Sequence, residues 1–160
     1  MPGSNGNFVI YLGVEENSDF IWFLLAHEVM HLLNPFIQDW YMEGLASYFA
    51  VQFCQQENVK LGGWLNIFNK IKENPYACSY RMIRDIAEVT PGALRSMRNY
   101  TLTNKKYPNT LKIDVDRWLA SMSVSDRNTV LAKIRPYMKE MKKYSNSRIS
   151  FTIPSAIYND

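Results

Sequence analysis

The sequence of 160 residues contains only two histidines, His27 and His31, and only two cysteines, Cys54 and Cys78. Two cysteines can pair or stay reduced, so they define neither a disulfide framework nor a cellular compartment. No apolar run is long enough to span a bilayer, and the first residues, MPGSNGNFVIYLG, lack the basic start and long apolar run of a signal peptide. We therefore expect no membrane span, and the localisation stays open.

The chain also lacks a concentration of charge. Its 18 Lys and Arg residues against 15 Asp and Glu residues give a formal net charge of +3, and the basic residues are scattered, so a nucleic-acid-binding groove is not indicated. The hydrophobic content of 47% is typical of a globular chain with a core. Without internal repeats or linkers, the sequence predicts one domain over residues 1–160, with a loose leader at 1–6 and a loose tail at 145–160. The oligomeric state is not indicated.

The sequence pattern predicts a mainly α (α+β) fold with a very small β element. The β-branched and aromatic residues of NFVIYLGV, residues 7–14, predict a strand. A helix is predicted over about residues 18–33, with Ser18 or Asp19 as its cap, and it ends at Asn34 because a residue that precedes proline is disfavoured in helices. Five more helices are predicted later in the chain, within WLNIFNKIK, YACSYRMIRDIAEVT, PGALRSMRNY, IDVDRWLASM and DRNTVLAKIRPYMKEMKKY, the last one kinked at Pro136.

The two histidines lie in an almost purely apolar helix, FLLAHEVMHLL. Apolar residues surround its axis, so we expect a buried central helix. His27 and His31 are four residues apart and project from one helix face, where both can bind one cation, and Glu28 points to the side, within reach of a water on that cation. His-Glu-x-x-His on a helix is the pattern of two zinc ligands and a general base. The alternative is a hydrogen-bonded pair of core histidines with an incidental glutamate.

Tetrahedral zinc with two histidines and a water needs one more protein ligand. Glu43 is the candidate, because a helix over WYMEGLASYFAVQFCQQ, capped by Asp39, would return alongside the first helix and bring Glu43 back to the histidines. The alternative is that Glu43 is not a ligand and is only a first-turn glutamate favoured by the helix dipole.

The segment WYMEGLASYFA resembles the Trp-x-x-Glu-Gly-x-Ala-x-Tyr signature of the gluzincins, zinc peptidases with two His ligands and one Glu ligand, and most of all their aminopeptidase-type and peptidase MA-like branches. The segment PYACSYRMIRDIAEVTPGALRSMRNY is similar to the one that these families place after the ligand helix, and VDRWLASM resembles their Trp-containing late helix. The resemblance covers roughly residues 20 to 122. The chain differs in a shorter spacing before Glu43, in Ser79 where many relatives have Gly, and in the single strand predicted before the histidine helix. It is therefore either a minimal gluzincin-like zincin domain or one that lacks an upstream domain.

The resemblance implies a zinc-dependent metallopeptidase with one Zn²⁺ per chain, bound by His27, His31 and Glu43. Glu28 would be the base that assists the attack of zinc-bound water, and Tyr76 would stabilise the tetrahedral intermediate, with Tyr80 as the reserve candidate. We expect a peptide or protein substrate and endopeptidase activity. The alternative for Tyr76 is an aromatic residue that packs on the core. The alternative for the whole chain is a catalytically inactive gluzincin-like binding module that retains a structural metal site.

Overall fold

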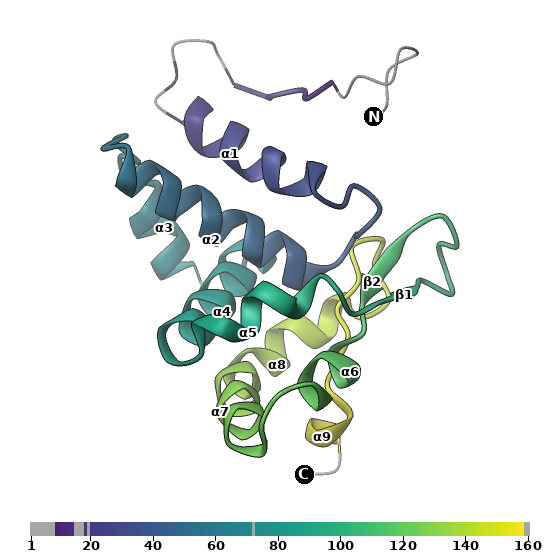
Figure 1. The fold of residues 1–160 in the computed structure, drawn as a ribbon. Helices are drawn as coiled ribbons and strands as arrows, with labels where there is room; N and C mark the ends of the chain where they lie inside the picture. Colours follow the sequence, from purple (N-terminus) through teal and green to yellow (C-terminus); the bar gives the residue numbers. More distant parts are fainter. Residues whose placement is uncertain (1–8, 15–17, 19, 72, 159–160) are drawn as a thin grey trace.

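Helices dominate the structure, a computed structural model that describes residues 9–14, 18, 20–71 and 73–158 (Figure 1). The α-helices are α1 (Ile21–Leu32), α2 (Trp40–Gln56), α3 (Trp64–Lys70), α4 (Pro75–Val89), α5 (Pro91–Met97), α6 (Val115–Ala120), α7 (Val124–Ile134), α8 (Met138–Met141) and α9 (Ser155–Tyr158). Short 3₁₀ helices cover Arg135–Tyr137 and Lys142–Tyr144. The predicted kink is confirmed, because the 3₁₀ turn that contains Pro136 separates α7 from α8.

The one sheet among the described residues is an antiparallel pair of strands, β1 (Thr101–Thr103) and β2 (Leu111–Ile113), with Thr101 opposite Ile113. This confirms a mainly α fold with a small β element, but the strand lies elsewhere in the chain than predicted. Residues 9–14 form no strand, and residues 7 and 8 lie outside the described residues. A strand needs a hydrogen-bonded neighbour, and Tyr11 in the middle of this segment is 83% exposed. The β propensity of the segment is therefore not enough to form a strand.

The cap predicted for α2 is confirmed, whereas the one predicted for α1 is not. Asp39 accepts a hydrogen bond from the Tyr41 N–H with its Oδ1 at 2.8 Å, which caps α2. Asn74 accepts one from the Ala77 N–H at 3.1 Å and is followed by Pro75 in the first turn of α4. Before α1, the Ser18 hydroxyl accepts from the Phe20 N–H at 3.3 Å, but the N-cap position of α1 is Phe20 and no side-chain cap bond is made there. Asp19 lies outside the described residues. Local sequence thus defines where α2 and α4 begin.

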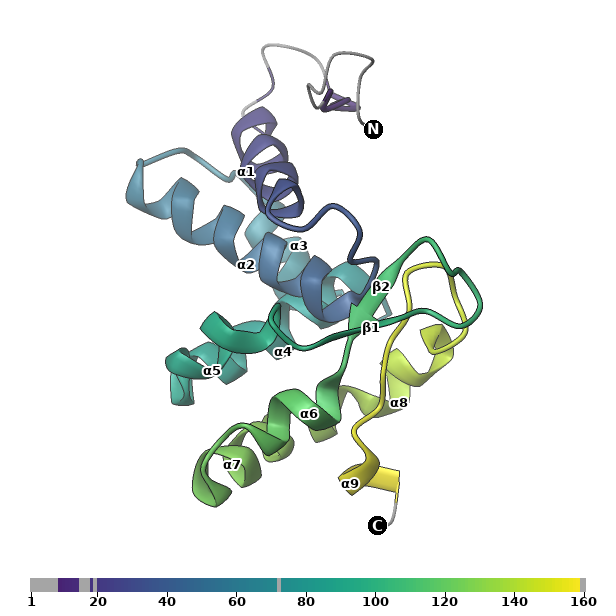
Figure 2. The ribbon, with the colours of Figure 1, turned by 45° about the vertical axis from the view of Figure 1, so that its right-hand side comes forward.

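Helix α2 packs against α1 and against α4, as both views of the ribbon show (Figures 1 and 2). Gly44 permits the close approach to α4, since a Cβ at this position would lie 2.5 Å from the Ser79 carbonyl oxygen and 2.7 Å from Ile83 Cγ1. The larger core cluster joins α2 and α4 to α5, β2, α6, α7 and α8. A smaller cluster joins α1 to the C-terminal half of α2. The residue after Glu43 therefore determines how closely the two central helices pack.

Helix α1 lies at the edge of the fold and not at its centre, so the expectation of a buried central helix is wrong. Only Phe23, Ala26 and His27 are buried in it. Trp22 is 51% exposed and Val29 is 42% exposed, because α2 is the helix against which α1 chiefly packs in the described part of the chain. Within the described residues, none of the helices is long and apolar enough to cross a membrane.

The C-terminal residues, expected to be loose, include a segment that packs on the core. The Ser150 N–H donates to the Gln38 carbonyl at 3.2 Å, and the Trp40 N–H donates to the Ser150 carbonyl at 2.9 Å. Phe151 is 2% exposed and stacks on the Tyr41 ring with the ring centroids 4.9 Å apart. This segment of the tail is therefore ordered by hydrogen bonds to, and packing on, the start of α2, which is distant in the sequence.

Candidate metal centre

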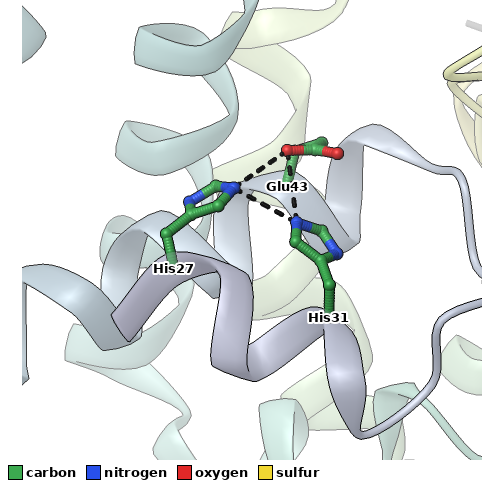
Figure 3. A group of neighbouring side chains, drawn as sticks. All are labelled: His27, His31 and Glu43. Carbon is green, nitrogen blue, oxygen red and sulfur yellow. Dashed lines mark hydrogen bonds and ion pairs between the residues drawn. The ribbon is translucent and has the colours of Figure 1, made fainter. Parts of the chain in front are cut away.

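The structure brings His27, His31 and Glu43 together (Figure 3). The histidines lie one turn apart on α1, and Glu43 lies in the first turn of α2, which returns along α1 after a short loop. His27 Nε2 and His31 Nε2 are 3.1 Å apart, and Glu43 Oε2 lies 3.2 Å from the first and 3.5 Å from the second. Three ligand atoms from two helices thus converge on one point and could hold a metal ion.

The electrostatics of the site keep Glu43 ionised. Burial opposes ionisation of Glu43, but hydrogen bonds from His27 and His31 outweigh it and lower the pKa of Glu43 to about 2. Burial would lower the pKa of His31, but the hydrogen bond to Glu43 and the charges of Glu43 and Glu28 raise it. Glu43 is therefore a carboxylate at neutral pH, the form that binds metals, although it is only 9% exposed.

Ser47 supports the first histidine. It lies four residues after Glu43 on the same face of α2, it is 1% exposed, and its Oγ is 3.3 Å from His27 Nδ1. In the tautomer that metal binding requires, a proton on Nδ1 is donated to this hydroxyl, and Nε2 is left with a lone pair for a cation. Partners of this kind fix the tautomer and the ring orientation of metal-binding histidines.

Asp39 supports Glu43 from the start of α2. Its Oδ1 accepts from the Tyr41 N–H, and its Oδ2 accepts from the Ile113 N–H of β2 at 3.3 Å. Asp39 is fully buried, and this burial raises the pKa of its carboxyl to about 7 against the lowering effect of these two hydrogen bonds. The side chain thus ties β2 to the helix turn that carries Glu43.

A cavity of about 580 Å³ contains the three ligands and Glu28. Glu28 follows His27 on α1 and lines the cavity, but it does not belong to the group of three that could hold a metal ion. Its negative charge raises the pKa of both His31 and Tyr76. Glu28 therefore shares the cavity with His27, His31 and Glu43.

Tyr76 lines the same cavity, and Tyr80 does not. Asn74 and Pro75 begin α4 at the edge of this cavity, so that Tyr76 in the first turn is 40% exposed and meets the Trp40 ring edge-on at 5.0 Å. Burial, and then the charges of Glu43 and Glu28, raise the pKa of Tyr76, which keeps its hydroxyl protonated as a donor. Tyr80 is 4% exposed and packs edge-on against Phe68 in the smaller core cluster.

Three residues of the site were not predicted from the sequence. The i, i+4 spacing from Glu43 is a signal that would have found Ser47. Asn74 was overlooked although it precedes a Pro-Tyr pair. Arg148 lines the cavity from the C-terminal segment, and its sequence surroundings carry no signal. The two cysteines, whose pairing was left open, are both buried and form no disulfide.

Comparison of the chain with protein-family models, with curated proteins and with solved structures finds no match. The function has to be inferred from the residues and the geometry of the cavity.

Proposed function

We propose that the chain is a zinc-dependent metallopeptidase of the gluzincin type. One observation carries the proposal: the three ligand atoms are separated by 3.1, 3.2 and 3.5 Å. Ligands held at about 2.0–2.1 Å around a tetrahedral zinc ion are about 3.3 Å from one another. The separations in the protein match this value, and two imidazoles with one carboxylate are a ligand set of catalytic zinc.

The surroundings of the ligands support a catalytic site over a structural one. Structural zinc sites are closed by four protein ligands, whereas catalytic sites keep a position open. Here three ligands lie in a cavity of about 580 Å³ that also contains a carboxylate and a phenol, Glu28 and Tyr76. A structural site has no use for either group.

Each residue then has a separate task. His27, His31 and Glu43 would hold the ion, which when bound supplies a Lewis acid that activates water and polarises a carbonyl. Glu28 takes a proton from the attacking water and delivers it to the leaving amine. Tyr76 donates a hydrogen bond to the substrate carbonyl oxygen as negative charge develops on it. Ser47 holds the His27 ring in position.

The test is a digest of a diverse peptide library by zinc-loaded protein, read by mass spectrometry, with wild type and Glu28→Gln in parallel. We expect wild type to cleave peptides and Glu28→Gln to keep its zinc and lose nearly all turnover, because an amide cannot accept the proton. Glu57→Gln, at the exposed end of α2, is the matched control and should behave as wild type. Wild-type turnover in Glu28→Gln would refute the role of the base. A zinc-loaded wild type that cleaves nothing would favour the inactive binding module.

A further inference from the structure

The cavity has two chemically different ends. At the first turn of α1 its lining is apolar and is formed by Phe20, Phe23, Leu24 and Phe68. After the last turn of α1 its lining includes Gln38 and Arg148 beside the apolar residues Pro35, Ile37 and Ile149. A helix of 12 residues separates these ends by about 18 Å, and His27 and His31 lie on α1 between them. A peptide that crosses the metal position along α1 therefore meets an apolar surface on one side and a cation on the other.

The apolar end is built from packed aromatic rings. Phe20 stacks on Phe23 with the ring centroids 4.8 Å apart, and Phe68 meets Phe23 edge-on at 5.9 Å. Phe20, Leu24 and Phe68 are only partly buried, so they keep apolar surface at the cavity. A large apolar side chain that enters here would exchange water for aromatic contacts.

Arg148 is held at the other end by the C-terminal segment. Its Nε donates to Gln38 Oε1 at 3.3 Å. Two residues after Arg148, the Ser150 N–H donates to the Gln38 carbonyl oxygen. Arg148 is exposed, and no acidic side chain among the described residues forms an ion pair with it. Apart from the two histidines, it is the only basic residue among the described residues that line the cavity. The guanidinium is therefore available to a ligand of opposite charge.

We propose that the cavity selects peptides with a large apolar side chain on one side of the scissile bond and a carboxylate on the other, and that Arg148 determines the second preference. This inference rests on the proposed function, since the peptide has to lie across the metal position. Arginine recognises carboxylates through paired hydrogen bonds in a fixed plane. The carboxylate is either an Asp or Glu side chain or the C-terminus of the peptide.

The test measures binding without turnover, by fluorescence anisotropy of labelled peptides on zinc-loaded Glu28→Gln protein. The peptides carry Phe or Ser on one side and Glu or Gln on the other at varied spacing, each with a free or an amidated C-terminus. We expect Phe to bind roughly tenfold more tightly than Ser. Glu should bind roughly fivefold to tenfold more tightly than Gln, since an exposed arginine gives only a part of the strength of a buried pair. If amidation removes the preference and the Glu-to-Gln exchange does not, the recognised carboxylate is the C-terminus.

Substitutions of Arg148 test whether this residue determines the carboxylate preference. In the Glu28→Gln background, Arg148→Gln should reduce the carboxylate preference to about one, and Arg148→Glu should invert it in favour of Lys-containing peptides. Arg95→Gln, an exposed arginine of α5 outside this cavity, should keep the preference. A preference that survives in Arg148→Gln, or the absence of peptide binding, would overturn the inference. Selective binding without any cleavage by wild type would refute the proposed function and leave the inference standing.

Discussion

Alanine in place of Ser47 tests whether the site is built around His27 as a metal ligand. The substitution removes the hydroxyl 3.3 Å from His27 Nδ1, in a position that is 1% exposed. Loss of such supporting partners costs 10-fold to 100-fold in metal affinity. Because 3.3 Å is long for a hydrogen bond, we expect the lower end, a tenfold loss of zinc affinity, or about 1.4 kcal/mol.

The assay is a competitive zinc titration against a chromophoric chelator at neutral pH. Ser96→Ala on α5 is the matched control, since it also removes a helix serine hydroxyl that forms a hydrogen bond, here to the Ala93 carbonyl at 3.2 Å, but one that does not contact the histidines. The control should bind zinc as wild type does. Equal zinc affinities of wild type and Ser47→Ala would refute the argument that this hydroxyl holds the His27 ring for metal binding.

Two further predictions concern Tyr76 and Asp39. Tyr76→Phe should keep its fold and its zinc and lower kcat by roughly a hundredfold to a thousandfold with little change in KM, whereas Tyr80→Phe should change kcat only slightly. Steady-state kinetics on a cleaved peptide measure both effects. An unchanged kcat in Tyr76→Phe would exclude Tyr76 as the hydrogen-bond donor. The folded pKa of Asp39, about 7, lies above its ordinary 3.8, so its contribution to stability is present at low pH and is lost as the pH rises through 7. Urea unfolding of zinc-free protein should therefore show about 2–3 kcal/mol more stability at pH 5 than at pH 8 from this group, and Asp39→Asn should lack that increment; identical pH dependences of the two proteins would contradict it.

The proximity of His27, His31 and Glu43 could be predicted from the sequence because it depends on local features. The i, i+4 spacing puts His27 and His31 on one face of any helix that forms there. Asp39 begins α2 next to the loop, so Glu43 falls in the first turn, where the short connection returns it to α1. The start of α4 is equally local, since Asn74 and Pro75 define it. These elements need no knowledge of distant parts of the chain.

Several features that the sequence did not reveal depend on distant partners. Residues 9–14 have strand-forming side chains but pair with no strand, whereas β1 and β2 pair across a loop that contains Pro108. The segment around Ser150 gains its order from Gln38 and Trp40, more than a hundred residues earlier in the chain. The same long-range pairing places Arg148 at the cavity. The exposure of α1 was equally unpredictable, because apolar composition does not report how many neighbours a helix has.

Zinc stoichiometry tests the central claim most directly. After loading with zinc and exhaustive dialysis, elemental analysis of wild type should give one zinc per chain, and His31→Ala should give almost none while circular dichroism still shows a folded helical protein. Glu57→Gln should retain zinc as wild type does. Stoichiometric zinc in folded His31→Ala, or no zinc in wild type, would contradict the ligand set of His27, His31 and Glu43.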